Sequence, residues 1–232
     1  MLKALLTDVD GTITNTGREV STGAIDAMRG LISHGVEIVL ASGNTTCFMD
    51  ALSRMIGTGG TLIGENGGVY RIGFLGDLHI TGQKSVSLHA LRIIEEYYHS
   101  KGVELQLYSP QYRFSDVAFA RMVPAEEVRT VLEESGAQVI DTGFAIHLQE
   151  QGVNKGRAFL DLARDMGLSP KDFLAIGDGV NDVEMIRAAG IGVAVGNAHQ
   201  SAKDAAVYVT KKRYGDGFVE AVDTYSSYFL ER

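Results

Sequence analysis

The stretch LLTDVDGTIT, from Leu5 to Thr14, decides the fold. It joins the apolar run Lys3–Thr7 to two aspartates, Asp8 and Asp10, and a glycine follows directly. An unbroken apolar run of this length is typical of a strand that is buried on both faces, as in a parallel sheet. The two like charges at its end repel each other. They are tolerable together if a cation neutralises them and if the two carboxylates do different work.

Composition indicates an ordinary globular protein. The chain has 232 residues, enough for one large domain or for a core with a smaller partner. Its net charge of −8 argues against a general binder of nucleic acid or membrane surfaces, since both partners attract basic patches. Cys47 is the only cysteine, and the apolar N-terminal run is too short for a signal peptide or a membrane span. We therefore expect a soluble cytoplasmic protein, either a monomer or a homodimer.

Strands alternate with helices on both sides of a central segment. The first part predicts a strand at 3–7, a helix after Ser21, a strand at 36–42, a helix to about Ile56 and a strand at 61–66. The last part predicts helices at 154–167, 180–190, from about 201 and from about 218 to the C-terminus, with strands at 172–178, 191–196 and 207–210. This order predicts an α/β fold, a doubly wound, Rossmann-like parallel sheet with helices on both faces.

Between these parts the order of elements changes. Residues 67–82 have the pattern of a glycine-punctuated hairpin. The next stretch predicts helix, strand, strand, helix, strand, strand, at 87–100, 103–109, 116–123, 124–136, 137–141 and 144–150. That order favours a small antiparallel α+β module. We expect a core made of residues 1–83 and 153–232, interrupted by a cap at 84–152.

Polar residues follow several of the predicted strands. In open parallel sheets, ligands bind at the carboxyl ends of the strands, so these residues should share one edge. They are Asp8, Asp10, Ser42, Gly43, Asn44, Asp178 and Asp182, with Lys155 at the start of the helix that follows the cap. Several carboxylates in one place favour a hard cation such as Mg²⁺. The donors Ser42 and Lys155 suit a phosphoryl group, with Asp8 as nucleophile and Asp10 as general acid and base.

Four short motifs occur in a recognisable order: DVDGT, ASGN, the lysine of NKG, and GDGVND. Together they resemble the motifs of the haloacid-dehalogenase-like phosphatase superfamily, and the resemblance covers the whole core. The insert, with ENGG at 65–68 and VAVGNA at 193–198, is similar to the cap and loops of the Cof-like branch. ASGN with the compact cap resembles archaeal-type phosphoglycolate phosphatases. The resemblance implies a Mg²⁺-dependent phosphomonoesterase that acts on phosphoglycolate, with a cap that selects the substrate.

The resemblance also implies a role for each motif residue. Asp8 would form an aspartyl-phosphate, and Asp10 would protonate the leaving group. The carboxylates of Asp8 and Asp178 and the backbone carbonyl of Asp10 would hold Mg²⁺, with Asp182 in support. Substrate contacts would come from Ser42, Gly43, Asn44, Lys155, Asn66 and Asn197.

One departure from the Cof-like pattern keeps other substrates open. Many members have arginine where this chain has Asn44, so a sugar phosphate or another small phosphorylated metabolite is the alternative. A phosphomutase and a non-hydrolytic phosphate acceptor are other classes. Asp10 argues against the acceptor, which needs no acid for a leaving group. The carboxylate of phosphoglycolate needs its own donor, and Arg113 and Arg121 of the cap are the first candidates.

Three further residues have simpler expected roles. Cys47 has no histidine near it in sequence, so a small buried residue is a better interpretation than a thiol nucleophile. His89 and His147 alternate with apolar neighbours and show no metal-ligand spacing. We expect both at the surface or in the packing of the cap.

Overall fold

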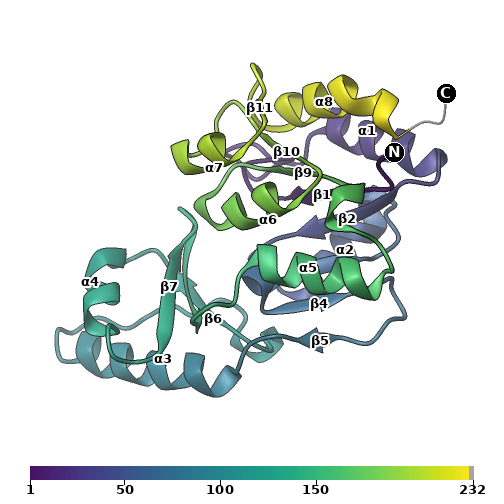
Figure 1. Ribbon diagram of the computed structural model, residues 1–232. Coiled ribbons are helices and arrows are strands. Elements are labelled where there is room, and N and C mark those ends of the chain that lie inside the picture. The colour runs from purple at the N-terminus through teal and green to yellow at the C-terminus, as the bar shows by residue number, and fades with distance from the viewer. Residues whose placement is uncertain (230–232) are drawn as a thin grey trace.

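The computed structural model of the protein describes residues 1–229 and contains two sheets (Figure 1). The larger sheet consists of β1 (Ala4–Asp8), β2 (Glu37–Ala41), β3 (Leu62–Gly64), β4 (Val69–Arg71), β5 (His79–Ile80), β9 (Phe173–Gly177), β10 (Ile191–Ala194) and β11 (Tyr208–Val209). Its spatial order is β11-β10-β9-β1-β2-β3-β4-β5. The strands from β11 to β3 are parallel, and β4 and β5 extend the sheet as an antiparallel hairpin.

The register of this sheet places chemically important segments side by side. β1 lies in the middle and pairs with both β2 and β9. Asp8 is opposite Ala41, and Thr7 is opposite Ile176. Because the three strands are parallel, the loops that follow them emerge at the same edge.

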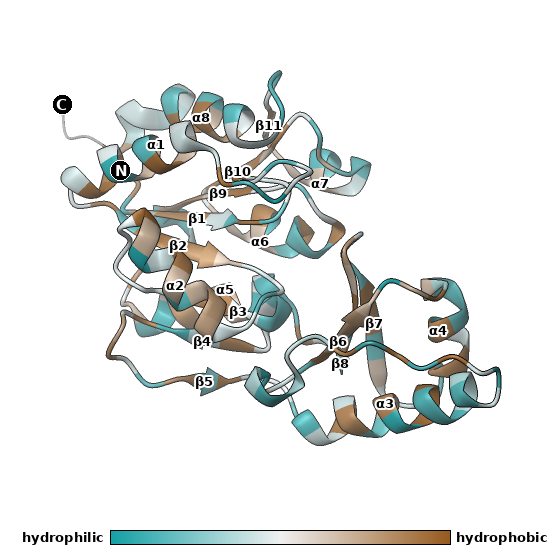
Figure 2. Cartoon of the chain, turned by 180° about the vertical axis from the view of Figure 1, so that it is seen from behind, coloured by the Kyte–Doolittle hydropathy of each residue, from teal (hydrophilic) through white to brown (hydrophobic). Residues whose placement is uncertain are grey.

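Helices cover the large sheet, and contacts divide them into two groups. One group is α1 (Thr22–Ser33), α2 (Thr46–Ile56) and α8 (Tyr214–Tyr225), and the other is α5 (Lys155–Asp165), α6 (Val183–Ala188) and α7 (Gln200–Ala205). The two views show α2 and α5 on opposite faces of the sheet (Figures 1 and 2). α1 begins as its sequence predicts, because the Ser21 hydroxyl accepts the backbone N–H of Ala24. No helix in the described part of the chain is both long enough and apolar enough to cross a membrane.

The smaller sheet belongs to the inserted segment and has its own hydrophobic core. Its elements are α3 (Lys84–His99), β6 (Val117–Ala120), α4 (Ala125–Val131), β7 (Ala137–Asp141) and β8 (Ala145–Glu150). The strand order is β6-β8-β7, and all pairs are antiparallel. Ile94 of α3 packs with Phe119, Ile146 and Leu148 of the sheet. The prediction of a doubly wound parallel sheet with an inserted α+β module is therefore confirmed, whereas the exact boundaries at 84 and 152 stay a prediction.

The elements predicted at 103–109 and from about 218 onward differ from the structure. The strand expected at 103–109 is an irregular extended segment that joins β6 through one bridge, Leu107 with Phe119. Pairing ends there because Ser109 adopts a left-handed conformation, with φ of 51°, and a proline follows it. The last helix begins at Tyr214 rather than near Phe218. The part of that prediction that covers 230–232 lies outside the described residues.

Candidate functional site

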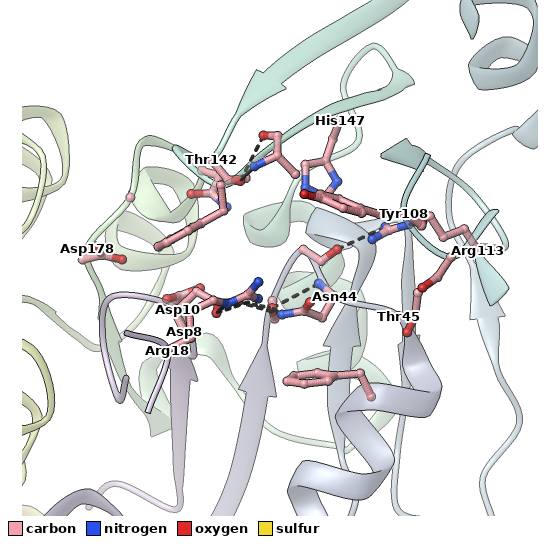
Figure 3. Close-up of a pocket in the computed structure, with 18 residues that line it drawn as sticks. Asp8, Asp10, Arg18, Asn44, Thr45, Tyr108, Arg113, Thr142, His147 and Asp178 are labelled. Carbon is pink, nitrogen blue, oxygen red and sulfur yellow. Dashed lines mark hydrogen bonds and ion pairs between the residues drawn. The ribbon is translucent and has the colours of Figure 1, made fainter. Parts of the chain in front are cut away.

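A cavity of about 540 Å³ lies between the carboxyl edge of the large sheet and the inserted segment (Figure 3). Its core side includes Asp8, Asp10, Arg18, Ser42, Gly43, Asn44 and Asp178, and its cap side includes Tyr108, Arg113, Thr142, Phe144 and His147. This volume is in the range of pockets that bind small molecules. The cavity therefore suits a small metabolite in contact with both parts of the chain.

A buried lysine anchors the floor of this cavity. Lys155 opens α5, where Asn154 caps the helix, and its side chain is inaccessible to solvent. Its Nζ donates to Asp8 Oδ1 at 2.5 Å and to Asp182 Oδ1 at 2.7 Å. Burial alone would lower the pKa of Lys155, but the charges of Asp182 and Asp8 hold that pKa above its ordinary value. The ammonium therefore stays charged. Removing one of its two aspartate partners would leave a buried charge whose desolvation cost is no longer compensated.

Three carboxylates meet beside this lysine. Asp8, Asp178 and Asp182 each offer one oxygen, and these oxygens lie within 4.8 Å of one another. Asp182 is already well satisfied, because its other oxygen accepts the backbone N–H groups of Asp178 and Gly179. In contrast, Asp8 Oδ2 is buried and has no hydrogen-bond partner. An unpartnered carboxylate oxygen beside two further acids fits a divalent cation, which would supply the missing positive charge.

The raised pKa values of these carboxylates also favour a bound cation. Burial, followed by the charge of Asp182, raises the pKa of Asp8 well above its ordinary value. The same two causes raise the pKa of Asp178 to about 7. These carboxylates are thus costly to ionise together even beside Lys155, and a bound metal ion would lower that cost.

Asp10 lies in a different environment from Asp8. β1 ends at Asp8, so Asp10 lies in the following turn. Asp10 Oδ1 accepts from Arg18 Nε at 3.1 Å and Nη2 at 3.0 Å, and its Oδ2 accepts from Asn44 Nδ2 at 2.7 Å. The Asn44 amide also donates to Ser42 Oγ. The turn gives the two aspartates different surroundings. Asp8 contacts Lys155, whereas Asp10 accepts hydrogen bonds from the neutral amide of Asn44 and the guanidinium of Arg18.

The remaining sequence candidates lie behind the cavity wall. Asn66 is buried and accepts from Asn181, and it packs against Gly43 so closely that a Cβ there would approach Asn66 Nδ2 within 2.9 Å. Asn197 donates to the Gly11 carbonyl and accepts the backbone N–H of Tyr214. Both side chains fix loops that carry site residues. Their predicted contacts with substrate or metal, like the other assigned roles, stay predictions.

The structure also separates the two candidate arginines of the cap. Arg113 lines the cavity, whereas Arg121 pairs with Asp141 outside it. The interpretation of Cys47 as buried was wrong, because it is exposed on the first turn of α2.

Two basic residues that line the cavity, His147 and Arg18, were not assigned to the site from the sequence. His147 is only 4% exposed and faces the cavity rather than the outer surface. The alternation in β8 could have revealed this, because Ile146 and Leu148 enter the cap core and His147 must then face the other way. Arg18 lies in the loop after β1, with its guanidinium 5.3 Å from the centre of the Phe144 ring. No sequence pattern signals that position.

Comparison with known proteins agrees with this architecture. Residues 5–138 and 126–222 match the family model described as haloacid dehalogenase-like hydrolase. A phosphoglycolate phosphatase of Methanoculleus marisnigri is 56% identical over all of both chains, and one of Methanospirillum hungatei is 48% identical over all of both chains. The crystal structure of Thermoplasma acidophilum 0175 superposes with a TM-score of 0.86 at 25% identity, covering 99% of this chain and 100% of that one. The chain belongs to the haloacid dehalogenase-like hydrolase family.

The acidic group leads to a testable dependence of stability on pH. The pKa of Asp178 rises from 3.8 to about 7 on folding, so the folded chain holds this proton more tightly than the unfolded chain. The resulting stabilisation is present at pH 4 and is lost as the pH rises through 7. We expect the melting temperature in excess chelator to fall between pH 5 and pH 8, by about 2–4 °C for each kcal/mol lost. Asp178→Asn should flatten this fall, and Asp26→Asn on the exposed side of α1 should not. An equal fall of the melting temperature in wild type and Asp178→Asn would contradict the raised pKa of Asp178.

Proposed function

We propose that the protein is a Mg²⁺-dependent phosphomonoesterase that converts 2-phosphoglycolate to glycolate and phosphate through an aspartyl-phosphate. The observation that carries the proposal is the position of Asp8, whose Oδ1 is held by Lys155 while Oδ2 has no partner. Asp8 also lines a cavity of the size of a small metabolite. The two archaeal relatives that match along their whole length bear the name phosphoglycolate phosphatase, which supports the choice of substrate.

Asp8 is the nucleophile in this proposal. Lys155 fixes one carboxylate oxygen, so the carboxylate has few orientations from which to attack phosphorus. Lys155 is not among the residues that line the cavity, and its ammonium is committed to Asp8 and Asp182. It thus contributes by orienting the nucleophile and balancing its charge.

Asp10 is the general acid and then the general base. Its carboxylate lies on the same cavity and is held by Arg18 and Asn44, which fix its direction. It donates a proton to the leaving oxygen of the ester and then accepts one from the water that cleaves the aspartyl-phosphate. Ser42 and Gly43 line the cavity beside it and are the proposed phosphoryl contacts.

The carboxylates of Asp8 and Asp178 and the backbone carbonyl of Asp10 are the proposed ligands of Mg²⁺. Asp182 supports Asp178, because its Oδ2 accepts the backbone N–H of Asp178. An all-oxygen set of this kind favours Mg²⁺ over softer metals. When bound, the ion neutralises negative charge at the phosphoryl group. A cytoplasmic location and a monomeric or homodimeric state stay predictions from the sequence.

The metal assignment predicts a requirement for Mg²⁺. Excess chelator should abolish phosphate release, and added Mg²⁺ should restore it. Asp178→Asn should need at least about tenfold more Mg²⁺ for half-maximal activity, because one anionic ligand is lost. The control is Asp26→Asn, which removes an exposed carboxylate far from the cavity lining. Full turnover in the presence of excess chelator would overturn the assignment.

The substrate assignment predicts selection for a carboxylate. Phosphoglycolate should be hydrolysed with a kcat/KM about 10- to 100-fold higher than ethyl phosphate, because a well-placed charged hydrogen bond is worth about 1.5–3 kcal/mol. Both esters should be measured at the same pH and ionic strength with saturating Mg²⁺. Equal values, or a preference for ethyl phosphate, would make a sugar phosphate the better candidate.

A further inference from the structure

The cap side of the cavity contains a buried acid that holds two basic residues. Asp116 is inaccessible to solvent, and its carboxylate accepts from Arg113 Nη1 at 2.8 and 3.1 Å. The same carboxylate lies 2.7 Å from His147 Nδ1. Burial opposes ionisation, but the hydrogen bond to His147 and the charge of Arg113 keep the pKa of Asp116 below its ordinary value. Asp116 therefore remains charged and fixes the directions of both basic side chains.

The cap segment that carries Arg113 and Asp116 is hydrogen-bonded to the core. The Glu65 carboxylate, just after β3, accepts the backbone N–H groups of Phe114, Ser115 and Asp116 at 2.8–3.1 Å. Arg113 Nη1 also donates to the carbonyl of Gly43 at 3.2 Å, and its Nε donates to the Tyr108 carbonyl. Arg113 is thus one hydrogen bond away from the loop that carries Ser42. A ligand bound at that loop needs only a short chain to reach the arginine.

Both basic residues keep a donor position for a ligand. Among residues 1–229, Arg113 Nη2 and His147 Nε2 have no hydrogen-bond partner, although both residues line the cavity. Figure 3 shows both side chains across the cavity from Asp8 and Asp10. The contact of Nδ1 with Asp116 leaves Nε2 as the ring nitrogen directed elsewhere. A ligand carboxylate can accept a hydrogen bond from Nε2 when that nitrogen carries a proton.

We propose that Arg113 and His147, joined through Asp116, form the subsite that binds the substrate carboxylate and determines specificity. This inference rests on the proposed function and adds the residues that select the substrate. The negative floor around Asp8 and Asp178 repels a second anionic group, so the carboxylate belongs on this opposite wall. Arg113 also donates to the carbonyl of Gly43, so it lies beside the loop that carries the proposed phosphoryl contacts.

The test compares two esters in single variants. Arg113→Ala and His147→Ala should each lower kcat/KM for phosphoglycolate at least about tenfold and leave the value for ethyl phosphate within about twofold. The ratio between the esters is the informative readout, because a merely structural role would lower both values together. Arg129→Ala removes an exposed cap arginine that pairs with Glu126, and it should change neither value.

Two conservative variants guard against misfolding. The amide nitrogen of His147→Gln lies near the place of Nε2, whereas that of His147→Asn lies near Nδ1. If Nε2 contacts the substrate, Gln should retain more of the preference for phosphoglycolate than Asn. Equal losses for both esters, or better retention by Asn, would overturn the subsite and leave the proposed function intact. Failure of the wild type to hydrolyse any phosphate ester would instead overturn the proposed function itself.

Discussion

The contact of Lys155 with Asp8 and Asp182 is the interaction on which the rest of the site depends. It joins residues that are 147 and 27 positions apart in the chain and holds them at one edge of the sheet. The parallel pairing of β1 with β9 brings the carboxylates together, and α5 supplies the cation. Without the ammonium, the floor of the cavity would hold buried acids with no compensating charge. One buried cation thus allows several carboxylates to share a small volume.

The two aspartates that open the motif are compatible because their surroundings differ. Asp8 is buried beside Lys155, where the pKa is raised by burial and by Asp182. Asp10 lies in the turn that follows β1, and its carboxylate accepts hydrogen bonds from Arg18 and Asn44. Different environments allow two neighbouring carboxylates to do nucleophilic and acid–base work in one site. The cap adds a third environment on the opposite side of the cavity, where Asp116 holds two basic side chains in place.

The core could be predicted further from sequence than the cap side of the cavity. Apolar runs and alternating elements were enough to place the ends of β1, β2 and β9 at one edge, because parallel topology leaves little choice. The position of His147 depends on how β8 faces the core, and that of Arg18 depends on the path of a loop with left-handed backbone at φ of 62°. The position of Arg18 leaves no periodic signal, and the alternation in β8 indicates the direction of His147 only once it is known which face of the strand meets the cap core. Cys47 was misjudged because short-range composition says little about which side of a helix meets solvent.

The most direct test of the account is to trap the phosphoryl group on Asp8. Asp10→Asn lacks the base that activates water, so the intermediate should accumulate with an ester that needs no acid, such as p-nitrophenyl phosphate. Rapid mixing with Mg²⁺ should release about one equivalent of nitrophenolate per active site, followed by a much slower phase. Acid quenching and peptide mass spectrometry should then locate the phosphoryl group on Asp8. A steady release without a burst, or a phosphoryl group on another residue, would contradict the account.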